Sequence, residues 1–289
     1  MRYPFIRQQS KAYPITVLCR VMKVCRSCFY EYLKRCKNPK RDILLECLES
    51  RIKAIFLESR SSYGSRRIAR KLQSEQYVIG RYRTRSLMKK LELTVRRKKG
   101  YIVTTDSSHS YHVAPNLVDR RFDVDRLNLV WASDITYIRT VEGWLYLAIV
   151  MDLYSRQIVG WNMGKTTEAI LACDALRMAY KRRHPGPGLT HHSDRGIQYA
   201  CDQYQELLEK YQFQVSMSRK GDCWDNAPVE RFFRSLKSER LAFQRFASRQ
   251  SARMEVLDYI TFYNTDRLHS YLGYLSPMDF ERNSLLAVA

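Results

Sequence analysis

Apolar residues recur every three to four positions through the first third of the chain, and this spacing predicts a series of short helices. The predicted helices cover residues 15–22, 29–33, about 42–58, 63–72 and 83–91. Two short helices joined by a tight turn are typical of a helix-turn-helix unit. We therefore expect a helix-turn-helix-like region in residues 1–40 and a second, basic helix-turn-helix domain in residues 41–100, with its turn near Gly80.

The pattern changes at Leu129, where runs rich in Val, Ile, Tyr and Trp predict strands. The predicted strands cover residues 129–139, 143–155, 157–163, 188–194 and 213–218. Helices are predicted over residues 166–183, 202–211 and 227–241. Three hairpin-linked strands followed by strands that alternate with helices predict a mixed five-stranded α/β sheet. We place this core at 129–245, with a linker at 101–128 before it and a helical tail at 246–289 after it.

Positive charge is concentrated in the first part of the chain. The 289 residues include 50 Lys plus Arg and 29 Asp plus Glu, a net charge of +21. Residues 1–130 hold 30 basic and 11 acidic residues, net +19, whereas residues 131–289 hold 20 and 18, net +2. Such a concentration on a helical region favours a nucleic-acid partner over a bundle whose Lys and Arg are merely solvated. The candidate DNA-contact residues there are Arg81, Arg83, Arg85, Lys89, Lys90, Arg96, Arg97, Lys98 and Lys99.

No segment has the composition of a membrane span or of a secretory signal. The longest strongly apolar run, Trp144 to Met151, has eight residues, whereas a span needs about 20. The N-terminal sequence MRYPFIRQQSK contains no apolar region and no cleavage site. We therefore expect a cytoplasmic protein without a membrane partner, with its eight cysteines as free thiols. Cys25 and Cys28 form only one close pair, which disfavours a zinc site with four ligands.

Three acidic residues in the second half are candidates for chemistry. Asp134 lies in the middle of a predicted strand, Asp194 ends the fourth strand, and Glu230 lies in the first turn of a helix. Strand ends and helix starts can converge on one end of a sheet, where clustered carboxylates would bind divalent ions that stabilise charge during phosphodiester chemistry. The alternative is that each acid is an ordinary surface residue or cap. Asp152, which follows a strand, is interpreted as the start of a turn.

The spacing of these acids is more specific than the acids themselves. Between Asp194 and Glu230 lie 35 residues, and Lys237 follows Glu230 by seven positions. This arrangement resembles the DDE catalytic core shared by retroviral integrases and many bacterial transposases. Within that group the chain resembles the downstream-frame (OrfB) protein of the insertion sequence three family. The motifs that carry the resemblance extend over essentially the whole chain and are YGSRRI, WASDITY, GWLYLAIVMDLYSRQIVGW, HSDRGIQY, GDCWDNAPVERFFRSLK and YNTDRLHSYLGYLSPMDF.

The resemblance implies a ribonuclease-H-like core in which Asp134, Asp194 and Glu230 are catalytic and hold two Mg²⁺ ions, or Mn²⁺ in their place. It implies a transposase that binds the ends of an insertion element as double-stranded DNA, cleaves a strand and joins the 3′-hydroxyl to target DNA. Arg234 and Lys237 share a helix face with Glu230 and are candidates for holding the DNA backbone. A homo-oligomer on DNA, an upstream-frame protein or its fusion as partner, and a bacterial, nucleoid-associated location are also implied.

Other interpretations stay open at this point. A metal-dependent nuclease would use the same acids without joining strands, and a DNA-binding regulator or modulator of transposition with an inactive core would keep the basic region. Trp131 is expected in the core, and Asn226 or Asp225 at the N-cap of the helix that carries Glu230. The residues that either contact DNA or substrate, or form structural hydrogen bonds, are His192, Asn264, Arg267 and His269.

Overall fold

The computed structural model describes residues 2–37, 42–95, 113–220 and 222–288, which form two compact units divided between Ala54 and Ile55. In the first unit, helices α1 (Arg2–Gln9), α2 (Ile15–Val21) and α3 (Arg26–Lys37) share a small core of Ile6, Cys19 and Phe29. The sequence pattern predicts α2 and α3 but misses α1. The reason is that α1 buries only Ile6, so it has no apolar period to read.

Three further helices form the basic region: α4 (Ile43–Glu58), α5 (Ser65–Ser74) and α6 (Arg81–Lys90). Ile68, Ala69 and Leu72 form one buried face of α5, as an amphipathic helix requires. On α6 the small apolar face of Leu87 and Met88 is buried, and the basic residues lie on the exposed surface. The two helices pack against each other, and they confirm the predicted helical pair after α4.

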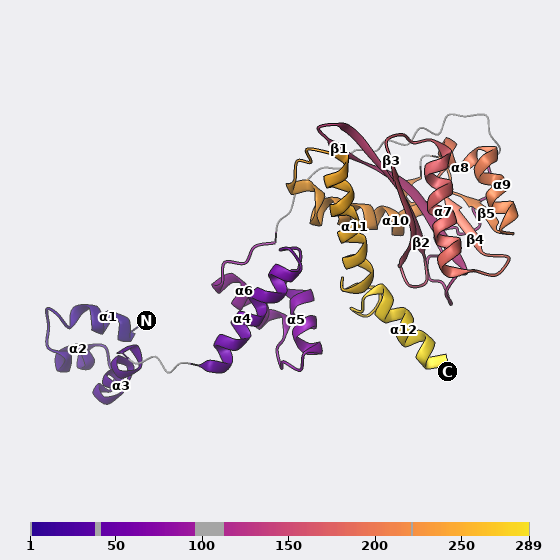
Figure 1. Cartoon of the computed structure of the whole chain (residues 1–289). Helices are drawn as coiled ribbons and strands as arrows, with labels where there is room; N and C mark the ends of the chain where they lie inside the picture. Colours follow the sequence, from indigo (N-terminus) through magenta and orange to yellow (C-terminus); the bar gives the residue numbers. More distant parts are fainter. Residues whose placement is uncertain (1, 38–41, 96–112, 221, 289) are drawn as a thin grey trace. The chain divides into compact units, whose positions relative to one another are not determined.

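Five strands form one mixed sheet in the order β3-β2-β1-β4-β5 (Figure 1). Strands β1 (Val130–Thr140), β2 (Gly143–Asp152) and β3 (Ile158–Gly164) are an antiparallel meander. The short strands β4 (Thr190–Ser193) and β5 (Gln214–Met217) add on the other side of β1, each parallel to its neighbour. The predicted mixed five-stranded α/β sheet is confirmed.

Helices cover both faces of this sheet. Helices α7 (Ala169–Arg183), α8 (Ile197–Ala200) and α9 (Asp202–Lys210) share one core with Trp131, which is fully buried as predicted. Backbone contact is close here, because a Cβ added to Gly160 of β3 would lie 2.2 Å from the carbonyl oxygen of Ala175 in α7. Helix α8 was not predicted, since four residues are too few for a helical period.

The opposite face of the sheet is covered by α10 (Ala227–Glu239) and α11 (Arg249–Thr265), whose buried side chains share the second core. Two 3-10 turns flank α10: η1 (Cys223–Asn226) and η2 (Leu241–Phe243). The chain then ends with α12 (Pro277–Val288), whose Glu281 is buried and pairs with Arg183 of α7. No helix in the described ranges is long and apolar enough to cross a membrane.

Candidate active site

The parallel register of β1 and β4 brings two of the three candidate acids to neighbouring positions. Ala132 of β1 pairs with His192 of β4. Asp134 and Asp194 each follow these paired residues by two positions. Asp134 accepts a hydrogen bond from the backbone N–H of Ile135 at 2.7 Å, and Asp194 accepts one from Gly196 N–H at 2.9 Å. Both carboxyl groups are therefore oriented by the backbone that follows them, and both residues are half-buried.

Glu230 reaches the same site from the first turn of α10. Asn226 occupies the predicted N-cap position, but its side chain makes no capping hydrogen bond. Its Nδ2 instead donates to the carbonyl oxygen of Ser133 at 3.0 Å, one residue before Asp134. Pro228 lies in the first turn, where the missing N–H costs nothing. Because Glu230 follows Asn226 by four residues, the two lie on the same side of the helix.

The charges of these acids affect one another. Burial, followed by the negative charges of Asp194 and then Glu230, raises the pKa of the Asp134 carboxyl well above its ordinary value. Burial raises the pKa of Glu230, and the charge of Arg234 opposes this. Burial lowers the pKa of Lys237, against the attraction of Asp134. Asp134 is therefore close enough to both other acids for their negative charges to act on it.

The donor set fits a hard divalent cation. All three side chains offer carboxylate oxygens, the ligands that Mg²⁺ prefers, and a cation would relieve the repulsion that raises the pKa of Asp134. Within the described ranges, however, no three His, Cys, Asp or Glu side chains are gathered tightly enough to form a ready-made metal site.

The turn that precedes α10 is fixed by the buried carboxylate of Asp225. This carboxylate accepts hydrogen bonds from Arg219 Nη2 at 2.8 Å, Arg120 Nε at 2.9 Å and Asn116 Nδ2 at 2.9 Å. The Arg219 hydrogen bonds, opposed by burial and assisted by Arg120, hold the pKa of Asp225 well below its ordinary value. We call this group the Asp225 clamp. Sequence reasoning missed it, because two of its members lie in the segment predicted to be a linker.

Removing the charge of the Asp225 clamp should reduce stability at neutral pH. We expect Asp225→Asn to lose about 1–2 kcal/mol, since the arginine partners are half-exposed and screened by solvent. A lowered pKa stabilises the folded state above the unfolded value of about 3.9, and this contribution is lost as the pH falls through the folded value. Urea unfolding of wild type and Asp225→Asn at neutral pH and at about pH 3 measures the difference in their free energies of unfolding. Equal stability of wild type and Asp225→Asn at neutral pH would contradict the prediction.

Two buried residues beside the acids have structural or unassigned roles. His192 contacts Ser216 Oγ through Nδ1 at 2.9 Å and the carbonyl oxygen of Asp225 through Nε2 at 3.0 Å, and burial lowers its pKa to about 4. These contacts support the structural interpretation of His192. Tyr199 of α8 was not predicted as a site residue. Its buried hydroxyl finds no hydrogen-bond partner among the described residues, and burial, then Tyr204, then Asp134 and Asp194 raise its pKa.

Other candidates are resolved by their contacts. Asp152 is buried and accepts hydrogen bonds from the backbone N–H groups of Asn128 and Tyr154, so it starts a turn as predicted. Asn264 bonds both backbone groups of Ile158 at 3.0 Å, which ties α11 to β3. The remaining tail residues, which also belong to a buried network, are Arg267 and His269.

The predicted DNA-contact residues fall into three groups. On α6, the side chains of Arg81, Arg83, Arg85, Lys89 and Lys90 are exposed. On α10, Arg234 is exposed, while the Nζ of Lys237 lies 4.9 Å from the centre of the Tyr137 ring. The third group, Arg96, Arg97, Lys98 and Lys99, lies outside the described residues. The cysteines that the structure reports, including Cys25 and Cys28, are free thiols.

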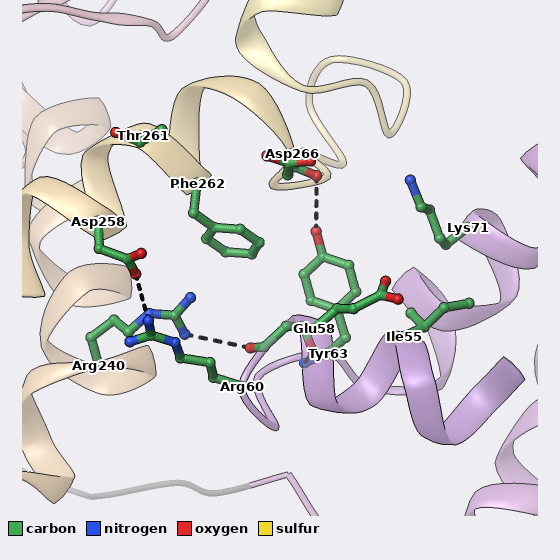
Figure 2. A pocket seen from close by; sticks show the side chains of 11 residues that line it. Ile55, Glu58, Arg60, Tyr63, Lys71, Arg240, Asp258, Thr261, Phe262 and Asp266 are labelled. Atoms are coloured by element: carbon green, nitrogen blue, oxygen red, sulfur yellow. Dashed lines mark hydrogen bonds and ion pairs between the residues drawn. The ribbon is translucent and has the colours of Figure 1, made fainter. Parts of the chain in front are cut away.

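A pocket of about 450 Å³ lies away from these acids, between the start of the second unit and α11. Figure 2 shows Arg60 directed toward Asp258 and the Tyr63 hydroxyl toward Asp266. Tyr63 Oη also accepts a hydrogen bond from the backbone N–H of Leu268 at 2.8 Å. None of the three candidate acids lines the pocket, which lies where the end of α4 and Tyr63 face α11.

Family models match three parts of the chain. Residues 45–101 match an HTH-like domain, and residues 125–223 and 211–277 match two models of an integrase core domain. The integrase core matches cover the strands and helices that carry all three acids. The fold and these matches therefore define a polynucleotidyl transferase with an integrase core, preceded by a helix-turn-helix-like domain.

Full-length relatives give the family. The chain is 38% identical over 287 residues, 99% of its length and 100% of the relative, to transposase InsF for insertion sequence IS3A of Escherichia coli strain K12. It is 40% identical over 264 residues, 91% of its length and 97% of the relative, to an uncharacterized 31 kDa protein of insertion element IS600 from Shigella sonnei. The chain belongs to the IS3 family of insertion-sequence transposases, which confirms the resemblance in the sequence.

Solved structures are more distant. The catalytic core domain of HTLV-2 integrase in complex with magnesium is 15% identical, with a TM-score of 0.42, covering 54% of this chain and 97% of that one.

Proposed function

We propose that this transposase cleaves a DNA strand at the end of its insertion element and joins the 3′-hydroxyl to target DNA, with Asp134, Asp194 and Glu230 as the catalytic, metal-holding residues. The observation that supports the proposal is the parallel register that brings Asp134 and Asp194 to neighbouring positions, with the negative charges of Asp194 and Glu230 both acting on Asp134. Such neighbouring negative charges are costly unless a cation compensates them.

Each residue has a defined part in this proposal. Asp134, Asp194 and Glu230 would hold two Mg²⁺ ions, or Mn²⁺ in their place. When bound, such ions stabilise charge on both the attacking and the leaving oxygen of a phosphodiester. Asn226 and the Asp225 clamp hold the start of α10 against β1, and thereby fix where Glu230 points. Lys237 adds a positive charge near Asp134 that would favour a phosphate there.

The test is incubation of the purified chain with labelled element-end DNA and Mg²⁺ or Mn²⁺, scoring both nicked and joined products. We expect both. Nicking without joining would indicate a nuclease instead, and binding without either product would indicate the regulator with an inactive core. The presence of Asp134, Asp194 and Glu230 in the sequence favours the transposase over the regulator.

The helical domain is the proposed DNA-docking part. We propose residues 41–100 as the domain that binds double-stranded DNA of the element ends, 129–245 as the catalytic core that also receives target DNA, and 1–40 as a further helix-turn-helix-like region. The exposed basic residues of α6 and the family match to an HTH-like domain support this. A homo-oligomer on paired ends, and association with an upstream-frame protein or its fusion, belong to the same proposal.

DNA binding by this domain should depend steeply on salt. Each phosphate contact lowers the logarithm of the association constant by about 0.9 for a tenfold rise in salt. Replacing Arg83 or Arg85 by Ala should therefore reduce the salt slope by about 0.9 where that side chain contacts a phosphate. Fluorescence anisotropy over a salt series measures the slope, with Lys210→Ala on α9 as a control of equal charge change. A slope unaffected by either arginine variant would exclude α6 as the docking surface.

A further inference from the structure

An exposed tryptophan stands on the turn that leads into α10. Trp224 lies in η1 and leaves 68% of its surface exposed, whereas Trp131 is fully buried. An exposed indole offers a flat apolar face on which another planar group can stack. Sequence analysis did not single it out, because its exposure cannot be read from the pattern.

The turn carrying Trp224 is attached to both strands that bear the candidate aspartates. His192, two residues before Asp194, contacts the carbonyl oxygen of Asp225 at 3.0 Å. Asn226 donates to the carbonyl oxygen of Ser133, one residue before Asp134, at 3.0 Å. Trp224 itself precedes Glu230 by six residues. The turn that carries Trp224 therefore lies next to the strand positions from which the candidate acids follow.

The backbone of the turn is also held by hydrogen bonds. The backbone N–H of Trp224 donates to Asp222 Oδ1 at 3.2 Å, and the next residue is held by the Asp225 clamp. The two clamp arginines, Arg120 and Arg219, keep about half of their side-chain surface exposed. The backbone that carries the indole is thus held on both sides of Trp224, and the two arginines are paired with Asp119, Asp222 and Asp225. A partner that stacks on the indole would not have to order this backbone first.

We propose that Trp224 stacks on a nucleobase of the DNA end that is unpaired next to the scissile phosphodiester. Phosphates are bound by cationic groups, whereas a flat aromatic ring binds the face of a base. A base inside a duplex has both faces covered, so the stacked base must leave the helix, as enzymes that act on DNA often require. Trp224 contributes to holding the end open beside the acids. This inference rests on the proposed function of the site.

The experiment is a double-mutant cycle in which Trp224 is changed in the protein and a base is removed from the DNA. Nicking by wild type and by Trp224→Ala is measured on a paired element end and on ends with an abasic nucleotide at each position flanking the scissile phosphodiester. On the paired end we expect Trp224→Ala to be about 10- to 100-fold slower. At one abasic position the two proteins should agree within about threefold, because the base that Trp224 contacts is gone. Trp224→Phe should recover most of the rate on the paired end.

Controls separate this contact from other roles. Met254→Ala removes an exposed apolar side chain of α11 and should leave the rate unchanged. A defect of Trp224→Ala that is equal on every abasic DNA would mean a structural role and would overturn the proposal. A defect that instead follows a change in sedimentation would indicate a second copy of the chain as the partner, and would also overturn it.

The same cycle can be read from equilibrium affinity without divalent metal, using a forked element end whose terminal bases are unpaired. Wild type should bind the forked end about tenfold more tightly than Trp224→Ala does. The two proteins should bind the fork that lacks the contacted base with equal affinity. This result separates the two proposals, because it needs no cleavage. Equal affinity of both proteins for the forked end would overturn the stacking contact even if the enzyme cleaves DNA.

Discussion

Replacing Asp134 by Asn is expected to lower both strand cleavage and strand transfer by about 1000-fold or more while leaving DNA binding intact. The amide has nearly the same size as the carboxylate but lacks the negative charge that holds a divalent ion. Asp194→Asn and Glu230→Gln should behave in the same way, because in the proposed site all three carboxylates hold the same ions. The acids also repel DNA phosphates in the absence of metal, so binding should be unchanged or slightly tighter.

The matched control is Asp202→Asn, which changes an exposed aspartate in the first turn of α9 and should retain full activity. Labelled ends scored for nicking and joining, together with an equilibrium binding curve, measure all four variants. Activity close to wild type in any of the three acid variants would remove that residue from the site. A parallel loss of binding would point instead to a folding defect.

The largest effect on stability is expected at Glu239, the last residue of α10. Its carboxylate accepts hydrogen bonds from Arg267 Nη2 at 2.7 Å and Nε at 2.9 Å, and from the Tyr259 hydroxyl at 3.0 Å. The Arg67 guanidinium of the YGSRRI segment lies 3.4 Å from the same carboxylate. Burial acts to raise the pKa of Glu239, but the hydrogen bonds and charge of Arg267 outweigh it and lower the pKa.

Glu239→Ala would leave the buried guanidinium of Arg267 without its counter-charge. We expect a loss of about 3–5 kcal/mol in unfolding free energy, which corresponds to a fall in Tm of roughly 6–20 °C for a unit of this size. Because the pKa is lowered, the contribution of Glu239 is present above the unfolded value of about 4.3 and fades as the pH falls through the folded value. Thermal unfolding measures this, with the exposed Glu206→Ala as control. A Tm shift no larger than that of Glu206→Ala would show that Arg267 finds another partner.

The sheet and most helices could be predicted because each leaves a local pattern. The meander of β1, β2 and β3 has long runs of buried residues, and α10 starts at a proline-containing turn. The candidate acids could be found because their spacing along the chain is distinctive. What brings Asp134 beside Asp194, the parallel register of β1 and β4, follows from pairing between strands more than 50 residues apart and has no local signature.

The residues that position the site were less accessible to sequence reasoning. Asn226 looks like a helix cap, and its bond to Ser133 becomes visible only when α10 meets β1. For Asn264 and Arg267, contact with DNA and a structural hydrogen bond are equally good interpretations until their partners are known. Polar side chains whose partners are distant in the chain carry no periodic signal, and so they are the part that the sequence cannot resolve.

The Asp225 clamp has a consequence for how this enzyme can be recombined with its relatives. Arg120 and Asn116 precede β1, yet they hold the turn that sets the direction of α10. A chimera joined just before β1 would combine the turn before α10 from one parent with the segment that carries Asn116 and Arg120 from the other. The hydrogen bonds that hold the turn, and with it the direction of Glu230, would then be lost. The smallest exchangeable catalytic unit therefore begins upstream of Asn116, in a stretch that by composition looks like a spacer.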